Sequence, residues 1–167
     1  GEKVLLVAGA GESWDELVRL AVEKKVWGIE NLSGIPGTVG GAVAGSIGAY
    51  GQALSQTLLW VEVLNREDGV VKKMTNAECL FGYRDSFFKT PEGKKYIVTT
   101  VTFHLRDKGV ANISYKDLAT YFANKPHPTI AEVRNAVIEI RTKKLPDLSK
   151  LGTAGSFFKN PIIPLAQ

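Results

Sequence analysis

A glycine-rich stretch is the first part of the sequence whose residue types and spacing could do chemistry. It reads Gly34-Ile-Pro-Gly-Thr-Val-Gly-Gly-Ala42 and continues in Gly45-Ser-Ile-Gly-Ala-Tyr-Gly51. Glycines at this density let several backbone N–H groups approach one ligand without Cβ collisions, which suits a pyrophosphate or the edge of a large aromatic cofactor. Tight turns in a small domain explain the same composition equally well, so both interpretations stay open.

Two further segments carry polar side chains among aromatic ones. Arg84 lies in Phe81-Gly-Tyr-Arg-Asp-Ser-Phe-Phe-Lys89, where a guanidinium could hold a carboxylate or stabilise developing negative charge. A surface arginine paired with Asp85 is the simpler interpretation of that segment alone. Ser156 lies in Gly152-Thr-Ala-Gly-Ser-Phe-Phe-Lys-Asn-Pro161, which lacks the second glycine of a nucleophile elbow. A turn serine and a proton-donating hydroxyl therefore both remain possible.

A third glycine pattern, Gly9-Ala10-Gly11, follows an apolar strand and precedes a helix. It looks like the start of a dinucleotide-binding fingerprint, but Trp14 stands where that motif needs its third glycine. We therefore predict an ordinary strand-to-helix turn.

Composition narrows the classes of protein. The chain has 167 residues, a formal charge of +4, one cysteine and two histidines, which argues against a disulfide framework and against a cysteine- or histidine-rich metal site. The lysines and arginines are spread along the chain, so we expect neither nucleic-acid nor membrane-surface binding. Residues 31–61 carry no charge, yet their proline, glycines and polar side chains argue against a membrane-spanning helix.

Local signals predict the elements that must position these segments. Capping boxes begin at Ser13, Thr75 and Thr129, before expected helices over 14–25, a short stretch near 76–80, and a helix that follows residue 129. Strands are expected over 57–64, 70–74 and 96–105, the first two joined by a hairpin with Asp68-Gly69 at its turn. Alternation over 96–105 places Ile97, Thr99, Val101, Phe103 and Leu105 on one side.

Taken together, the motifs resemble a known family, the UDP-N-acetylenolpyruvoylglucosamine reductases, flavoenzymes of bacterial peptidoglycan precursor synthesis. The resemblance rests on five motifs in one order. They are the glycine-rich run, Phe81-Gly-Tyr-Arg-Asp-Ser86, Ser114-Tyr-Lys-Asp-Leu118, Arg141-Thr-Lys-Lys-Leu-Pro-Asp147 and Ala154-Gly-Ser-Phe-Phe-Lys-Asn-Pro161. The Ser-Tyr-Lys-Asp segment is similar to the type of the family that has a tyrosine loop over its substrate.

The resemblance implies an α+β fold. Residues 1–125 would be the second subdomain of a vanillyl-alcohol-oxidase-like FAD-binding domain, and residues 126–167 the start of a substrate-binding α+β domain. It implies a cytoplasmic oxidoreductase that uses FAD and NADPH to reduce UDP-N-acetylglucosamine enolpyruvate to UDP-N-acetylmuramate. We expect this chain to lack the N- and C-terminal parts of such an enzyme and to be inactive alone; the alternative is a non-catalytic flavin- or nucleotide-binding module.

The resemblance also implies roles for individual residues. Ser156 would donate a proton and Arg84 would stabilise negative charge. The implied cofactor contacts are Pro36, Gly37, Thr38, Gly40, Gly41, Ile47, Gly48, Ile97 and Arg141, and the implied substrate contacts are Tyr115, Lys144 and Asn160. Gly45-Ser46 replaces the Gln-Asn that is frequent in this type, so amide contacts to the flavin are not expected at these two positions.

Overall fold

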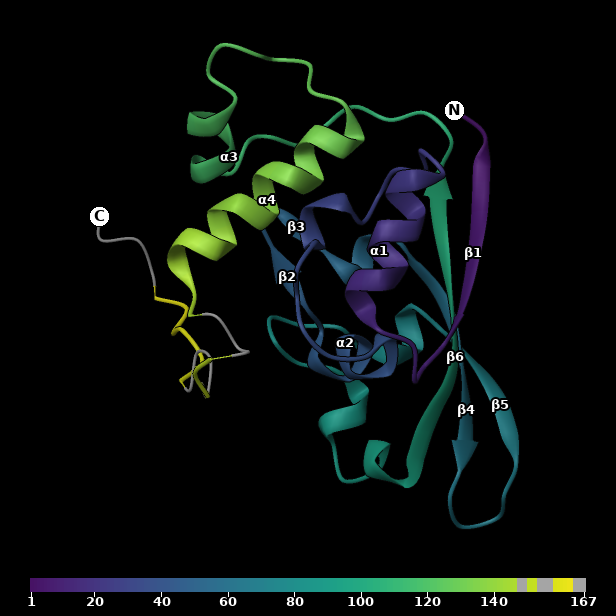
Figure 1. The fold of residues 1–167 in the computed structure, drawn as a ribbon. Coiled ribbons are helices and arrows are strands. Elements are labelled where there is room, and N and C mark those ends of the chain that lie inside the picture. Colours follow the sequence, from purple (N-terminus) through teal and green to yellow (C-terminus); the bar gives the residue numbers. More distant parts are fainter. Residues whose placement is uncertain (147–149, 153–157, 164–167) are drawn as a thin grey trace.

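The protein folds around an antiparallel sheet that is covered on one face by helices (Figure 1). The structure is a computed structural model that describes residues 1–146, 150–152 and 158–163. The order of elements is β1 (Lys3–Gly9), α1 (Trp14–Glu23), α2 (Val39–Gly45), β2 (Gly48–Ala49), β3 (Gln52–Ala53), β4 (Leu58–Asn65), β5 (Val71–Thr75), β6 (Tyr96–Arg106), α3 (Lys116–Tyr121) and α4 (Ile130–Lys144). Short 3-10 helices cover Glu30–Leu32, Leu54–Gln56, Ala77–Cys79, Phe87–Lys89 and Gly93–Lys95. The mixture confirms the α+β class.

The large sheet has the strand order β1-β6-β4-β5, with all neighbours antiparallel. The long strand β6 lies in its centre, and the hairpin of β4 and β5 forms one side as the Asp-Gly turn predicts. The strands β2 and β3 form a separate two-stranded hairpin. Strand β1 is an edge of the large sheet.

The main core lies between this sheet and the helices α1 and α2. Trp14 begins α1 and is fully buried, its ring edge-on to Phe103 of β6 at 5.9 Å between centroids. Its indole N–H donates to the carbonyl of Leu32 at 2.9 Å. The bulky ring thus fills the space where a dinucleotide fingerprint brings helix and strand together, and the Gly9–Gly11 segment is the strand-to-helix turn that the sequence predicts.

A bulge in β6 reverses the expected alternation of its side chains. Glu62 of β4 pairs with Thr100, but its neighbour Val63 pairs with Val98, so Thr99 has no partner across the ladder. An extra residue in one strand turns the following side chains to the opposite face. Val101 is buried whereas Ile97 is 49% exposed, so the prediction that both lie on the same side of the strand is wrong.

The predicted helix starts are confirmed. The hydroxyls of Ser13 and Thr129 accept the amides of Glu16 and Glu132, and α1 and α4 follow directly. Thr75 precedes a single 3-10 turn, Ala77–Cys79, which contains its hydrogen-bond partner Glu78. The helix α3 was not predicted from the sequence.

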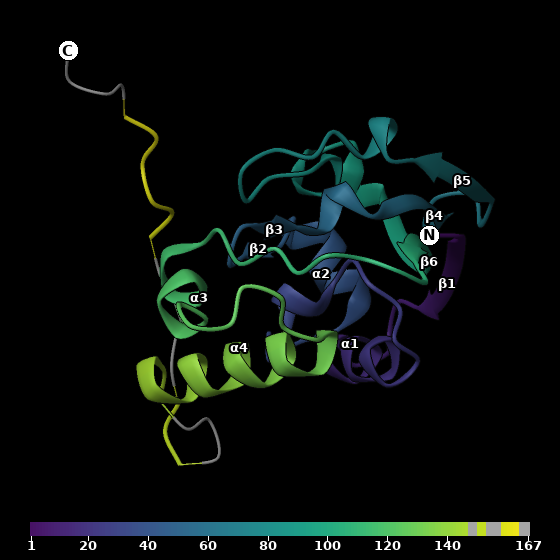
Figure 2. The same ribbon diagram turned by 90° about the horizontal axis from the view of Figure 1, so that it is seen from above.

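A second, smaller core joins α3 to α4, which lie side by side in Figures 1 and 2. Leu118 and Phe122 pack there against Val133, Val137 and Ile140. Helix α4 also contacts α1, and its Ile130 belongs to the main core. The proposed domain boundary between residues 125 and 126 therefore crosses two helices that pack together, and it stays a prediction.

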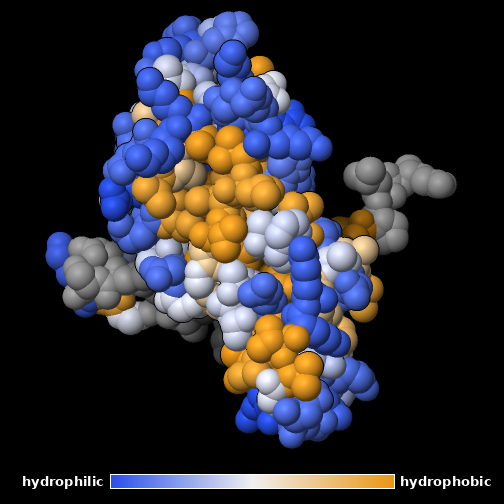
Figure 3. Space-filling model, turned by 90° about the vertical axis from the view of Figure 1, so that its right-hand side faces the viewer, coloured by the Kyte–Doolittle hydropathy of each residue, from blue (hydrophilic) through white to orange (hydrophobic). Residues whose placement is uncertain are grey.

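Apolar side chains remain exposed on the side of the molecule that carries the large sheet. Figure 3 shows them gathered in two areas of this side. The exposed apolar residues of β1, of the β4–β5 connection and of the strands beside it are Leu5, Val7, Val70, Val71 and Ile97. Among the described residues, no helix is long and apolar enough to cross a membrane.

Candidate functional site

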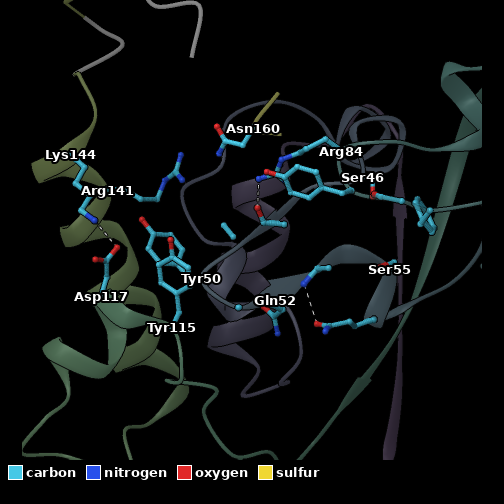
Figure 4. Close-up of a pocket in the computed structure, with 18 of the residues that line it drawn as sticks. Ser46, Tyr50, Gln52, Ser55, Arg84, Tyr115, Asp117, Arg141, Lys144 and Asn160 are labelled. Atoms are coloured by element: carbon cyan, nitrogen blue, oxygen red, sulfur yellow. Dashed lines mark hydrogen bonds and ion pairs between the residues drawn. The ribbon is translucent and has the colours of Figure 1, made fainter. Parts of the chain in front are cut away.

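A cavity of about 830 Å³ lies between the β2–β3 hairpin, the start of α3 and the last turn of α4. Its wall also includes the segment that contains Arg84 and, from the C-terminal part of the chain, Asn160. Figure 4 shows Arg141 and Lys144 on one side of this space, Arg84 on the other, and the rings of Tyr50 and Tyr115 near each other. Segments far apart in the sequence therefore meet at one site.

Six of the implied site residues line this cavity: Gly48, Arg84, Tyr115, Arg141, Lys144 and Asn160. The implied cofactor contacts Pro36, Gly37, Thr38, Gly40, Gly41, Ile47 and Ile97 do not line it. Ser156 lies outside the described residues. The sequence analysis missed several lining residues, among them Ser46, Tyr50, Gln52 and Asp117. Tyr50 and Asp117 lie inside motifs that were recognised, and this position could have identified them as site residues.

The charged residues of the cavity lining are mostly cationic. Among the described residues they are Arg84, Arg141 and Lys144, together with the carboxylate of Asp117. Lys144 forms an ion pair with Asp117 at 2.6 Å, and this hydrogen bond raises the pKa of Lys144 above its ordinary value. The lysine therefore stays protonated at neutral pH, and the cavity suits an anionic ligand.

Arg84 lies on a tight turn, and its guanidinium turns back toward the β2–β3 hairpin. Its Nη2 donates to the carbonyl of Gly48 at 2.6 Å. The Asp85 carboxylate accepts the amide of Ser86 at 3.0 Å, and no ion pair between Arg84 and Asp85 occurs among the described residues. The surface pair that the simpler sequence interpretation required is therefore not formed in this part of the chain.

Two tyrosines form an aromatic wall. The rings of Tyr50 and Tyr115 pack edge-on with 5.5 Å between their centroids. Burial raises the pKa of Tyr50, while the nearby cations Arg141 and Lys144 act in the opposite direction. Tyr115 is 46% exposed at the N-terminal boundary of α3, so its ring is accessible to a ligand.

The glycine-rich run leads from η1 (Glu30–Leu32) into α2 and packs against the turn after β1. The amides of Val39 and Gly40 donate to the carbonyls of Glu12 and Ala10. At Gly40 a Cβ would lie 2.9 Å from the Cβ of Ala10, so glycine is needed there for packing. At Gly37, by contrast, φ is +110° and nothing lies within 4 Å of the Cβ position. Both interpretations of the run thus have support, at different residues.

The open part of this run can accommodate a large flat or phosphorylated group. Pro36, Gly37, Thr38 and Gly41 are all exposed. A ligand can therefore reach the backbone at these positions. At Gly37 it would meet no neighbouring atom within 4 Å of the Cβ position. The residues therefore fit the approach of FAD, with Gly37 as the clearest case.

Two contacts connect the run to α4. Asp15 accepts the amide of Gly34 at 2.6 Å, and Arg141 donates from Nε to the carbonyl of Gly34 at 3.0 Å. Arg134 of α4 binds the same carboxylate of Asp15. Arg141 thus stands between the glycine-rich run and the cavity.

A second cavity, of about 240 Å³, shares the lining residues Gln52 and Gln56 with the first. Glu30 lines it and is only 3% exposed; its carboxylate accepts the amide of Gly28 at 2.7 Å. Burial raises the pKa of Glu30, with the backbone amides of residues 28–30 opposing. The Nε2 atom of His104 is buried there without a hydrogen-bond partner in the described structure. No group of three or more metal-binding side chains occurs among the described residues.

Comparison with known proteins gives the site a family context. Residues 1–75 match a family described as FAD binding domain. A curated protein of Bdellovibrio bacteriovorus named UDP-N-acetylenolpyruvoylglucosamine reductase is 45% identical over 157 residues, which is 93% of this chain and 47% of that protein. The protein of the same name from Flavobacterium johnsoniae is 43% identical over 157 residues, 92% of this chain and 47% of its own length. This chain resembles the UDP-N-acetylenolpyruvoylglucosamine reductases.

A solved structure agrees with this resemblance. The crystal structure of UDP-N-acetylenolpyruvylglucosamine reductase from Thermus caldophilus matches with a TM-score of 0.62 and 30% identity, over 85% of this chain and 44% of that one. The chain spans about half the length of the curated reductases that it matches. The resemblance inferred from the five motifs is confirmed, and the activity of a whole reductase becomes a proposal for this chain.

Proposed function

We propose that the chain forms part of an FAD-dependent UDP-N-acetylenolpyruvoylglucosamine reductase of peptidoglycan precursor synthesis. The enzyme would act in the cytoplasm and reduce the enolpyruvyl ether of UDP-N-acetylglucosamine enolpyruvate to the lactyl ether of UDP-N-acetylmuramate, with NADPH as the reductant. The observation that carries the proposal is the cavity in which Arg84, Tyr115, Lys144 and Asn160 meet. Its cationic lining suits a substrate that carries a diphosphate and a carboxylate.

In this reaction, FAD would supply the hydride for the enolpyruvyl group when it is bound. Negative charge then develops next to the substrate carboxylate, and Arg84 stabilises it as a permanent cation. Its orientation is prepared in advance, because Gly48 already holds one guanidinium nitrogen. A preorganised cation needs little rearrangement when the charge develops.

Ser156 completes the reaction by donating its hydroxyl proton to the enolate-like carbon. A hydroxyl is a weak acid, but an enolate carbon held against it is basic enough to take the proton. This role rests on the resemblance of residues 154–161 to the family motif.

Tyr115, Lys144 and Asn160 would hold the nucleotide-sugar diphosphate. Lys144 is paired with Asp117, which favours its protonated form. The exposed ring of Tyr115 offers a surface on which the ligand can pack. Arg141, between the cavity and Gly34, would contact the cofactor side.

The implied FAD contacts divide into two groups. Pro36, Gly37, Thr38 and Gly41 present exposed backbone near the start of α2, and Gly48 lines the cavity. We infer that the first group faces the phosphates and that Gly48 is nearer the reacting end. Gly40, Ile47 and Ile97 remain candidate contacts.

The experiment that tests the proposal uses the complete protein that carries this chain. The purified protein should show flavin absorbance and should oxidise NADPH only when UDP-N-acetylglucosamine enolpyruvate is added. Arg84→Lys should lower kcat by about 100-fold or more while FAD remains bound, the loss typical of one preorganised charge-stabilising group. Absence of both flavin absorbance and substrate-dependent NADPH oxidation would refute the proposal.

Ser156→Ala distinguishes the reductase from a non-catalytic flavin- or nucleotide-binding module. In a reductase, NADPH should still bleach the flavin of this variant, while substrate reduction collapses. In a binding module the variant and the parent protein should behave alike in both assays. Stopped-flow absorbance measures the two half-reactions separately.

We also propose that this chain alone is inactive, because the matched reductases are about twice as long. Their remaining parts, on the N- and C-terminal sides, would complete the cofactor and substrate sites. Titration of the isolated chain with FAD should give weak binding, and its NADPH oxidation should stay at background. Steady-state turnover by the isolated chain would contradict this.

A further inference from the structure

The turn that carries Arg84 has a backbone conformation that needs outside support. Arg84 has φ +54°, in the left-handed region that residues with a side chain rarely adopt. Backbone hydrogen bonds between Gly82 and Asp85, at 2.9 and 3.3 Å, close the turn on itself. Such a conformation persists only where the surrounding structure fixes it.

Two buried serines connect this turn to the end of α2. One donates a hydrogen bond from the end of α2 to the turn, and the other donates one from the turn to α2. The hydroxyl of Ser46, just after α2, donates to the carbonyl of Gly82 at 2.9 Å. The hydroxyl of Ser86, just after the turn, donates to the carbonyl of Ala44 at 2.8 Å. The two residues are only 8% and 2% exposed, so water competes little for these bonds.

The end of α2 is suited to this connection. Its last carbonyls have no intrahelical partner, and Ser86 satisfies the one on Ala44. Ser46 caps the helix with φ +47°, which turns its side chain away from the helix and toward Gly82. The same backbone turn leads into Gly48, whose carbonyl receives the guanidinium of Arg84 at 2.6 Å.

We propose that Ser46 and Ser86 are positioning residues that together hold Arg84 at the cavity. Each serine fixes one side of the turn, and Gly48 fixes the guanidinium against the same end of α2. This inference rests on the proposed function only where it predicts a loss of catalysis when Arg84 moves. The claim that the two serines restrict the motion of the Arg84 side chain does not depend on that function.

The two serines differ in a way that makes the test sharp. Ser46 lines the cavity, so its loss could also affect a ligand directly. Ser86 is not among the lining residues, so its hydroxyl reaches the cavity only through the turn. Equal effects of Ser46→Ala and Ser86→Ala therefore indicate that both act on Arg84.

The first experiment measures the order of the Arg84 side chain in this 167-residue chain. Nitrogen-15 relaxation of its Nε–Hε group measures an order parameter. We expect about 0.85, as for rigid backbone, in the parent and less than about 0.6, as for flexible backbone, in either alanine variant. Ser46→Asn should restore the parent value, because asparagine tolerates φ above zero and can donate to the Gly82 carbonyl. Thr120→Ala, which removes a hydroxyl that donates to the carbonyl of Lys116 on α3, is the matched control and should leave Arg84 unchanged.

The second experiment uses the complete protein and steady-state kinetics. Both alanine variants should lower kcat by about tenfold with KM changed less than about twofold, as expected for a slightly misplaced group that acts in the transition state. Ser46→Asn should recover kcat. Thermal unfolding of every variant shows whether the fold is retained.

The outcomes separate this inference from the proposed function. If the alanine variants lose stability but Arg84 keeps its order parameter, the serines are structural only and the inference is overturned. If Arg84 loses order in both variants, the positioning role is supported even where the complete protein shows no reductase activity. That last result would count against the proposed function alone.

Discussion

Asp15 on α1 and Arg134 on α4 are 119 residues apart in the chain and form a two-point ion pair, with N–O distances of 2.7 and 2.8 Å. Arg134 is nine-tenths buried, and Asp15 also accepts the amide of Gly34. This carboxylate therefore joins the first helix, the last helix and the glycine-rich run. Its charge, its burial and its hydrogen bonds each lead to a measurable expectation.

Breaking the pair from one side should destabilise the fold. In Asp15→Asn the buried guanidinium of Arg134 loses its counter-charge, and we expect the free energy of unfolding to fall by about 3 kcal/mol. Urea titration followed by tryptophan fluorescence measures the change. The double variant Asp15→Asn, Arg134→Met completes the cycle; strictly additive effects of the two changes would show that the pair contributes no coupling energy.

The same pair should make stability depend on pH under acidic conditions. The hydrogen bond from Arg134 lowers the pKa of Asp15 below its ordinary value, although burial opposes it. The folded state therefore binds this proton less readily than the unfolded state, and the stabilisation is complete above the unfolded pKa, about 3.9. It should be lost as the pH falls through the folded pKa. Unfolding curves between pH 2 and 6 should show a smaller acid-induced loss in Asp15→Asn than in the parent; parallel pH profiles would contradict the assignment.

Glu30 should have the opposite dependence. Burial raises the pKa of its carboxyl, so the folded state binds the proton more tightly than the unfolded state. Its contribution to stability is therefore greatest below the unfolded pKa and decreases as the pH rises through the folded pKa. Glu30→Gln keeps an oxygen that can accept the Gly28 amide and removes the charge. The stability of this variant relative to the parent should increase from pH 4 to pH 8, as measured by urea unfolding, and a constant difference would exclude a raised pKa.

Gly40 tests whether packing, and not only the approach of a ligand, requires glycine in the glycine-rich run. A Cβ at Gly40 would lie 2.9 Å from the Cβ of Ala10 and 3.2 Å from its carbonyl oxygen. We expect Gly40→Ala to lower the free energy of unfolding by about 1–2 kcal/mol without any cofactor present. Gly11→Ala is the matched control, because nothing lies within 4 Å of its Cβ position, and it should change stability by less than about 0.5 kcal/mol. Equal stability of the two variants would remove the packing explanation.

Local signals predicted the parts of the fold that depend on neighbouring residues. The cap signals at Ser13 and Thr129 predicted the starts of α1 and α4, because a cap and its helix lie within four residues. The full capping box is formed at Thr129, whereas at Ser13 the hydroxyl accepts the amide of Glu16 and the Glu16 carboxylate binds Arg19 instead. The bulge at Thr99 could not be predicted in this way. It arises from the pairing of β6 with β4, and only this long-range register shows why Ile97 turns outward.

The candidate site was predictable to the extent that its motifs were recognisable. Arg84, Tyr115, Lys144 and Asn160 were assigned by resemblance, and the fold brings them to one cavity. The spacing of these four residues along the sequence did not indicate that they line the same cavity. The contacts of Ser46 and Ser86 were missed because each joins residues about 40 positions apart, and a lone serine in a sequence does not identify its acceptor.

The backbone of Gly34 is held on both sides, its N–H by Asp15 of α1 and its carbonyl by Arg141 of α4. A rotation of α4 relative to the sheet would have to carry Gly34 with it or break the bond from Arg141, and it would also break the ion pair of Arg134 with Asp15. These contacts join α1, α4 and the glycine-rich run to one another. A ligand that enters the large cavity should therefore leave the distance between Arg134 and Asp15 unchanged.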